Sequence, residues 1–580
     1  METCDGGGLS PRQRSPLSVL LQILSAALTL PGGVATVRSL SQIWNSAPTM
    51  SLTPTQRIAF DTVAASLPFA LDPSKVTVVP GVSYVRSPVK AHDYAVGVMA
   101  AFGAVVEHLG RVRGLPSQTL MLDRRRCGLL LNSLQLLFQN GYSTIMDTWG
   151  INPDNGTYRA SDGRFVTMIG LHPHLRDRLL VALDCVNTAA GIQAAVEKKT
   201  AQQLEDEAIA TGLPLGIVRT PAEWAAHPIG AEVLNRPMID FQSTGREKKR
   251  LLGQARHRPL EGVRVVELTH VVAGPNCARF LAEQGADVIK VQPPMGDWVL
   301  PVWMDASWGK KNILLDIQGR RGMARLQELL ASADVLIDGQ RPGVLNRLGL
   351  DDDGLRAINP NLVRASLSCF PLGTAWAERP GFEQIAQAVS GTTHVHSTGM
   401  EAPTIVPALL NDYLTGYLVA IGAVAALAER EQHGGYFHVA ASLSRCSSLA
   451  PTFAEPLDAE PYEPVRMQDL IDHGIDQPSP AGIFTRIAPA VTFSHTPSFV
   501  DRHPTLMNSM PDTTGWDAVP TELPIVPHGP SQLAREGKIY GLVECFGIED
   551  RADGGGILSL ASKSLVDYLM AHRNDAHPMS

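Results

Sequence analysis

The stretch from residue 263 to 367 alternates short β-branched runs with helical segments, and this pattern restricts the fold more than any other feature. The runs are strand candidates: Val263–Leu268, Asp287–Val291, Ile313–Asp316, Asp334–Ile337 and Leu362–Leu367. Segments with helical spacing, such as Gly322–Leu330, separate them. Strands that alternate with helices form βαβ units and a parallel sheet. The sequence therefore predicts an α/β fold with a Rossmann-like, parallel-sheet large domain.

An internal repeat adds a second constraint. The segment His92–Gly97 aligns with Asn411–Gly416, and the same offset, carried on without a gap, aligns Arg126-Cys127 with Arg445-Cys446. Each copy is an alanine-rich apolar helix followed by a second apolar stretch. Repeats of this kind indicate duplication.

The region between the two copies predicts a smaller α+β domain. The segment Tyr158–Ile169 is typical of a hairpin, because Asp162-Gly163 stands between two β-prone runs. Thr220-Pro221 starts a helix, and Ser243–Arg258 is a polar linker. No comparable hairpin is expected after Cys446, so the order of the parts indicates a rearranged duplication. The expected domains are an N-terminal helical extension (1–55), a degenerate first copy carrying the small domain (56–250), the large domain with the second copy (256–450) and a C-terminal region (451–580).

Charge and cysteine content restrict the location and the partners. The net charge of −8 gives no electrostatic reason to expect nucleic acid or an anionic membrane. The seven cysteines are scattered, which indicates a reducing, cytoplasmic environment. The apolar segment Leu17–Leu30 is too short to span a bilayer and lacks a convincing cleavage site, so a buried first helix is expected.

Several kinds of chemistry lack their motifs. The first βα turn has no Gly-x-Gly-x-x-Gly fingerprint, which argues against a nicotinamide or flavin dinucleotide. The pairs His172/His174 and His394/His396 lack a third ligand at a recognisable spacing, so no metal is expected.

Thr269–Pro275 places small residues at the carboxyl end of a strand, where open α/β sheets bind ligands.

Many short motifs, in order, resemble one known family, the carnitine dehydratase-like family III CoA-transferases. They run from the strand and turn at the start of the large domain to the second copy of the repeat: Pro259–Val265, Ala273–Pro275, Gly285–Val291, Arg341–Leu345, Asn359–Val363, Arg379–Glu383 and Asn411–Gly416.

The resemblance implies a site and a reaction. Asp412 occupies the place of the carboxylate that attacks an acyl-CoA thioester, so the protein is expected to move CoA from an acyl-CoA to a carboxylic acid through an aspartyl-CoA thioester. His270, Val271 and Ala273 would line the CoA entrance, and Arg347 would meet a phosphate. CoA is then a substrate, and no tightly bound cofactor is implied. Asp93, the repeat equivalent of Asp412, is expected to be structural and to cap its helix.

Two alternatives stay open. One is acyl-CoA racemisation or epimerisation, although Phe382 stands where the related racemases carry a histidine. The other is a catalytically silent CoA-binding protein. The duplication is compatible with either a homodimer or an intrachain pseudo-dimer.

Overall fold

Seven strands form the main sheet, in the order β11-β10-β9-β12-β13-β14-β8. The computed structural model describes residues 49–145, 152–244, 250–296, 300–505, 510–522 and 525–540. The predicted helix at Leu17–Leu30 lies outside these ranges. Six strands run parallel and confirm the predicted parallel sheet, while β8 pairs antiparallel with β14. The strands are β8 (Asp240–Thr244), β9 (Arg264–Leu268), β10 (Asp287–Gln292), β11 (Lys310–Leu314), β12 (Val335–Asp338), β13 (Val363–Ser368) and β14 (Tyr436–Ser442).

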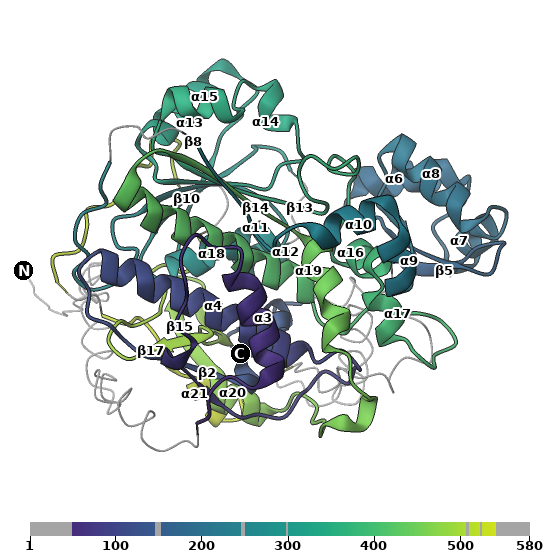
Figure 1. Cartoon of the computed structure of the whole chain (residues 1–580), viewed down its shortest axis with the longest axis horizontal. Coiled ribbons are helices and arrows are strands. Elements are labelled where there is room, and N and C mark those ends of the chain that lie inside the picture. The colour runs from purple at the N-terminus through teal and green to yellow at the C-terminus, as the bar shows by residue number, and fades with distance from the viewer. Residues whose placement is uncertain are drawn as a thin grey trace, which may run out of the picture. The chain divides into compact units, whose positions relative to one another are not determined.

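Alternate side chains of these strands point into two separate cores, because successive residues of a strand face opposite sides. Val265 packs with helices α11 (Ala273–Ala282) and α18 (Leu410–His433), and its neighbour Val266 packs with α13 (Arg320–Ser332) and α15 (Asp352–Ile358). Helices therefore cover both faces of the sheet (Figure 1). Shorter helices connect the rest: α12 (Leu300–Ala306), α14 (Val344–Arg347), α16 (Glu383–Ser390), α17 (Thr392–His396) and α19 (Leu443–Leu449).

The first repeat copy has the same order of elements as the second. Helix α4 (Ala91–Val112) leads to β2 (Leu120–Asp123) and α5 (Arg124–Leu129), as α18 leads to β14 and α19. Strand β2 lies between a parallel strand, β1 (Val76–Val79), and an antiparallel one, β17 (Val491–Phe493). Strand β14 lies in the same way between β13 and β8. Helices α4 and α18 pack against each other (Figure 1).

Both long helices are also long and apolar enough to cross a membrane. In each, however, most of the apolar window is buried inside the protein: 83% for α4 and 94% for α18. Their composition is that of helices surrounded by protein, which are hydrophobic on all sides.

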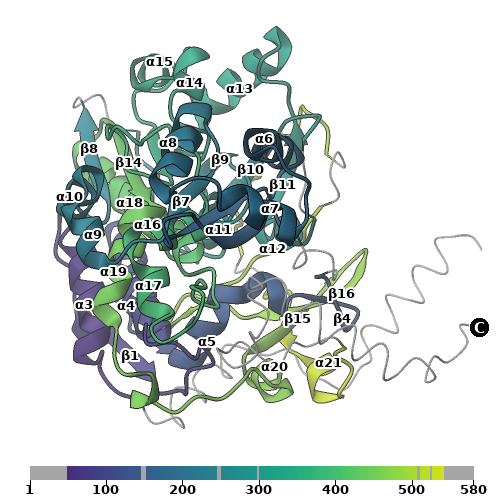
Figure 2. The ribbon, with the colours of Figure 1, turned by 90° about the vertical axis from the view of Figure 1, so that its right-hand side faces the viewer.

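The predicted hairpin is confirmed and belongs to a small domain. Strands β5 (Asn155–Arg159) and β6 (Phe165–Ile169) pair antiparallel, and β7 (Leu215–Ile217) extends their sheet. Gly163 in the turn has φ +78°, a conformation that glycine adopts without strain. The helices α6 (Pro173–Leu183), α7 (Ala189–Val196) and α8 (Ala201–Thr211) close its core (Figure 2). Strands β6 and β7 contact α16, so the small domain of the first half lies against the second copy.

The expectation that no hairpin follows Cys446 is wrong. Strands β15 (Gly474–Ser479) and β16 (Gly482–Ile487) form an antiparallel hairpin. Their sequence hides it, because Pro478 and Pro480 break the apolar alternation that normally indicates strands. The hairpin joins a five-stranded sheet with β18 (Gly529–Pro530), β3 (Phe138–Gln139) and β4 (Tyr142–Ser143). Connecting helices include α3 (Pro54–Ala64), α9 (Pro221–Ala226), α10 (Pro228–Asn235), α20 (Met467–His473) and α21 (Gln532–Arg535).

Candidate functional site

A cavity of about 350 Å³ lies at the carboxyl ends of β9, β12 and β13. It has the size of a typical small-molecule site. The turn after β9, the loops after β12 and β13, the first turn of α18 and the small domain all contribute to its lining. Its residues include His172, His174, His270, Val271, Val272, Ala273, Gln340, Arg341, Cys369, Phe382, Asp412 and Leu443. The three residues predicted to line the CoA entrance, His270, Val271 and Ala273, therefore line the same cavity as Asp412.

Asp412 lies in the first turn of α18 and is only 9% exposed. Its backbone N–H donates to Glu383 Oε2 at 2.6 Å. Within the described ranges its carboxylate makes no side-chain hydrogen bond or ion pair. Burial, together with the nearby Glu383 carboxylate, raises the pKa of Asp412 well above its usual value. A carboxylate in this setting is poorly solvated and therefore reactive once it ionises.

Glu383, at the start of α16, is the functional residue that the sequence reasoning did not single out. It is 1% exposed and accepts hydrogen bonds from Gln387 Nε2 at 2.7 Å and Asn411 Nδ2 at 2.8 Å, besides that from Asp412. Burial raises the pKa of Glu383 to about 7. Its position in the Arg-Pro-Gly-Phe-Glu motif was the available signal. Glu383 thus fixes the first turn of α18 and modulates the charge of Asp412.

The turn after β9 holds the predicted entrance residues. Val271 has φ +62°, which is rare and strained for a β-branched residue. Such strain persists where the surrounding structure imposes it, and it is concentrated at functional sites. His270 is exposed at the cavity, and partial desolvation, together with the Lys290 ammonium group, lowers the pKa of its imidazole. Its Nε2 lies 3.5 Å from Gln340 Nε2.

Arg347 lies apart from this group. It is exposed at the end of α14 and is not among the residues that line the cavity. Two other arginines line it instead: Arg341, from the same Arg-Pro-Gly segment, and Arg379. Lys310 and Lys311 are buried in ion pairs with Glu267 and Asp287.

The described residues contain no group of three or more His, Cys, Asp or Glu placed to hold a metal ion. His172 and His174 instead line the cavity from the small domain, with ring centroids 5.7 Å apart.

In the first copy, Asp93 holds the position equivalent to Asp412, and its carboxylate is bound by neighbouring side chains. Arg124 holds Asp93 through two bonds, Nε to Oδ1 at 2.9 Å and Nη2 to Oδ2 at 2.7 Å. Gln56 Nε2 donates to the same carboxylate at 2.8 Å. The expectation that Asp93 caps its helix is wrong, because α4 has no side-chain cap and Asp93 is ion-paired instead.

The repeat shows which residues make this difference. By the sequence offset, Arg124 corresponds to Leu443. A close helix contact identifies the second pair: a Cβ on Gly97 would meet the Gln56 carbonyl, and a Cβ on Gly416 would meet the Ala273 carbonyl. In the first copy, an arginine and a glutamine therefore bind the Asp93 carboxylate. The second copy has Leu443 and Ala273 at these two positions, and neither side chain can bind the Asp412 carboxylate.

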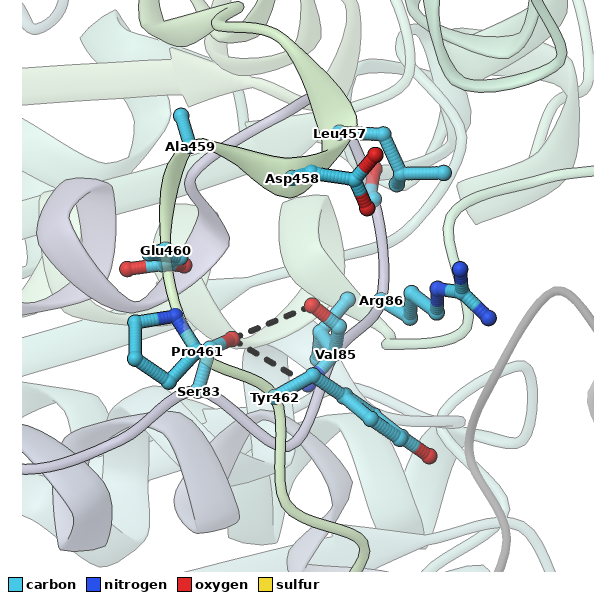
Figure 3. Close-up of a pocket in the computed structure, with 10 residues that line it drawn as sticks. Ser83, Val85, Arg86, Leu457, Asp458, Ala459, Glu460, Pro461 and Tyr462 are labelled. Carbon is cyan, nitrogen blue, oxygen red and sulfur yellow. Dashed lines mark hydrogen bonds between the residues drawn. The ribbon is translucent and has the colours of Figure 1, made fainter.

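A second cavity, of about 440 Å³, lies near the first copy (Figure 3). The loop Ser83–Ser87 forms one side and the segment Leu457–Tyr462 the other. Of its two acids, Asp458 and Glu460, the second is paired with Arg124 at 2.6 Å. None of the residues predicted to bind or react lines this cavity.

Comparison with known proteins relates one segment of the chain to a family. Residues 260–469 match the family model described as CoA-transferase family III. The matched segment includes Asp412, Glu383 and the β9 turn.

Several individual proteins are similar to part of the chain. The chain is 36% identical over 215 residues to the succinyl-CoA–L-malate CoA-transferase beta subunit of Chloroflexus aurantiacus, covering 34% of this chain and 53% of that subunit. It is 31% identical over 268 residues to an acyl-CoA transferase of Gibberella moniliformis, covering 44% and 47%. A crystal structure of Rv3272 from Mycobacterium tuberculosis is 32% identical, covering 34% and 57%, with a TM-score of 0.32. The chain thus spans about half the length of these relatives.

Proposed function

We propose that the protein transfers CoA from an acyl-CoA donor to a carboxylic acid acceptor through a covalent thioester on Asp412. The observation that carries this proposal is that the buried Asp412, whose carboxylate has no side-chain partner among the described residues, lines a ligand-sized cavity. The relatives' names include transfers from succinyl-CoA to malate and from formyl-CoA to oxalate. Acyl-CoAs and small carboxylic acids are accordingly the proposed substrates.

The reaction balances without a metal or redox step. The Asp412 carboxylate attacks the thioester carbonyl, CoA thiolate leaves, and a mixed anhydride forms. The thiolate then attacks the Asp412 carbonyl, which releases the donor acid and leaves an aspartyl-CoA thioester. The acceptor carboxylate displaces the thiolate to give a second anhydride. The thiolate finally attacks the acceptor's acyl carbonyl, and the Asp412 carboxylate is regenerated.

The CoA portion is proposed to enter past His270, Val271 and Ala273, along a Rossmann-like large domain. The amino-terminal end of α11, which begins at Ala273, offers backbone N–H groups and a partial positive charge to the reacting carbonyl. Arg347, exposed outside the cavity, is proposed to meet a CoA phosphate. CoA would bind as a substrate in a cytoplasmic enzyme.

The two copies are proposed to derive from a rearranged duplication and to act as an intrachain pseudo-dimer with one working site. This proposal is supported by the common order of elements around α4 and α18 and by the filled place at Asp93. A racemase is not favoured, because Phe382 lines the cavity where a histidine would be needed.

Matched substitutions test the proposal. We expect Asp412→Asn to abolish turnover and to keep the fold and CoA binding, because the amide retains the shape but lacks the nucleophilic charge. Asp93→Asn is the control and should retain most activity. Mass spectrometry of the wild-type protein mixed with acyl-CoAs should find CoA on the peptide that contains Asp412. CoA binding without turnover in the wild-type protein would favour the silent binding protein, and an adduct on Asp93 would reverse the roles of the two copies.

A further inference from the structure

The first turn of α18 carries Asp412 and begins after Leu409, whose apolar side chain cannot cap a helix. The first N–H groups of a helix have no partner within it and are normally bound by a polar N-cap side chain. Glu383 binds this turn from one side, through the Asp412 N–H and the Asn411 amide. The remaining support of the turn comes from a distant part of the chain.

The first half of the chain supplies this support through the 3-10 helix η2 (Leu130–Leu136), which follows α5. Asn132 Nδ2 donates a hydrogen bond to the Pro407 carbonyl at 3.0 Å. The Leu131 carbonyl accepts one from the Leu409 N–H at 3.1 Å. Both η2 residues are completely buried, and a hydrogen bond away from water is electrostatically stronger. The backbone that leads into α18 is therefore held by the degenerate first copy.

Tyr413, the second residue after Asn411 on α18, continues this link. Its hydroxyl donates to Asp305 Oδ2 at 3.0 Å and accepts a hydrogen bond from the Leu134 N–H at 3.1 Å. Ser133 Oγ donates to the same carboxylate oxygen at 2.8 Å. The side chains of these hydroxyl and carboxylate groups are at most 2% exposed. One buried carboxylate thus joins η2 to the first turn of α18.

The charges of this network are paired. Arg279 Nη1 donates to Asp305 Oδ1 at 3.0 Å, so a buried cation lies beside the buried carboxylate. Burial and the Asp305 carboxylate raise the pKa of Tyr413 well above its usual value, so its hydroxyl stays protonated and continues to donate. A fully paired buried network is rigid, because a displacement would leave one of its polar groups without a partner. The network therefore fixes the position of the Tyr413 ring.

The repeat shows that these side-chain bonds belong to one copy. By the same sequence offset, Pro451 and Thr452 correspond to Asn132 and Ser133. Proline has no side-chain donor, and Thr452 Oγ1 donates to a carbonyl three residues earlier in the chain. Neither residue can therefore give the first turn of α4 the support that η2 gives to α18.

We propose that η2 of the first copy positions Asp412 for its attack, with Asn132, Ser133 and Tyr413 as positioning residues. This role rests on the proposed CoA transfer and gives the degenerate copy a part in it. A nucleophile must lie within attack distance of the thioester carbonyl, and a misplacement of about 1 Å can cost a hundredfold in rate. Loss of the η2 contacts should therefore slow the chemical step and leave CoA binding unchanged.

Removal of single hydroxyl groups from the full-length protein tests the proposal. The measured rate is the exchange of labelled succinate into succinyl-CoA, expressed per site that binds CoA in calorimetry. Tyr413→Phe and Ser133→Ala should each lower this kcat about ten- to a hundredfold, with an unchanged Kd for CoA. The double variant should lose little more than the larger single loss, because both hydroxyls act through one carboxylate. Tyr94→Phe and Thr452→Ala remove the equivalent hydroxyls of the other copy and should keep most activity.

Hydrogen exchange adds a readout that needs no substrate. The peptide that contains Asp412 should exchange faster in Tyr413→Phe and Ser133→Ala than in the wild-type protein. Unchanged exchange would overturn the role of η2, whether or not the protein transfers CoA. Faster exchange with a wild-type kcat, or an equal loss of kcat in Tyr94→Phe, would reduce the network to a structural role. No succinate exchange and no CoA on Asp412 in the wild-type protein would remove the proposed function, and this proposal with it.

Discussion

Asp412 and Asp93 lie in equivalent helix turns, yet the Asp412 carboxylate has no side-chain partner among the described residues, whereas an arginine binds that of Asp93. The simplest test is to move that arginine. In Leu443→Arg, the guanidinium should pair with Asp412 as Arg124 pairs with Asp93. An ion-paired carboxylate is a weaker nucleophile, and the arginine side chain would also fill the space in which the substrate must approach Asp412. Turnover should therefore fall at least about a hundredfold. Initial rates and the yield of CoA adduct on Asp412 measure the effect. Leu443→Met supplies similar bulk without charge and should stay active; a fully active Leu443→Arg protein would contradict this account.

The Asp412–Glu383 pair predicts a pH dependence. Asp412 must ionise to react, and burial with the neighbouring Glu383 charge raises its pKa. Activity should therefore rise with pH as the pair loses its proton, with apparent pKa values that belong to the pair. Glu383→Gln removes the negative neighbour, which should lower the pKa of Asp412 and move the acid limb of the kcat/KM profile to lower pH. A limb that stays at the wild-type position would show that another group controls it.

Stability should follow the same pair. The pKa of Glu383 is raised to about 7 in the fold, so the folded state holds a proton that the unfolded chain releases near pH 4.5. The contribution of this proton to the free energy of unfolding is therefore fully present below about pH 4.5 and is lost as the pH rises to about 7. Chemical denaturation across this window should show a smaller loss in Glu383→Gln than in the wild-type protein. Equal losses of stability in both proteins would show that a group other than Glu383 takes up this proton.

At the residue scale, the sequence permitted the prediction of Asp412 and the β9 turn because short motifs carry them. The ion pair that holds Asp93 was not predictable in the same way. Gln56 and Arg124, which donate to Asp93, lie 37 and 31 residues from it in the chain, and Glu460, which accepts from Arg124, lies 336 residues from that arginine, so only tertiary packing brings these groups together. The strained φ of Val271 likewise follows from the surrounding fold and not from a local preference, since valine disfavours it.

At the scale of elements, the position of α18 against α11 sets the distance between Asp412 and the entrance turn. A Cβ on Gly416 would lie 2.7 Å from the Ala273 carbonyl, so Gly416→Ala must push the two helices apart. We expect a loss of about 1–3 kcal/mol of stability. A larger loss of turnover should follow, because misplacement by about 1 Å can cost a hundredfold. Denaturation midpoints and kcat measure the two effects. Gly515→Ala, where a Cβ meets open space, is the control; no change in Gly416→Ala would contradict the close contact.

Elements were predictable where one physical signal dominated. The central strands are buried on both faces, and their continuous apolar runs indicated them correctly. The β15–β16 hairpin has Pro478 and Gly482, and its pairing depends on a neighbouring strand, β3, from the other half of the chain. Local patterns do not contain that partner, so the second hairpin was missed.

In the whole molecule, each half supplies an edge strand to the sheet of the other. Strand β8 from the first half completes the sheet of the second along β14, and β17 from the second half pairs with β2 of the first. A buried ion pair, Arg125 to Asp469 at 2.7 Å, also joins the halves. This reciprocal exchange makes separate folding of either half unfavourable, because unpaired edges and apolar faces promote association.

Expression of the halves tests this arrangement. The segments 1–250 and 251–580, made separately, should be poorly soluble, since 251–580 would expose the β14 edge and the face of α18 that α4 covers. Co-expression should restore a soluble complex with CoA-transfer activity, because β8 and the small domain, with His172 and His174, return to the Asp412 cavity. Sedimentation and activity of the purified complex, compared with the intact chain, measure the recovery. Substituting Arg125→Ala in the 1–250 segment should weaken the complex, because Asp469 would then be left buried without its partner. If 251–580 alone were soluble, monomeric and fully active, the small domain would be dispensable and the pseudo-dimer would have no functional role.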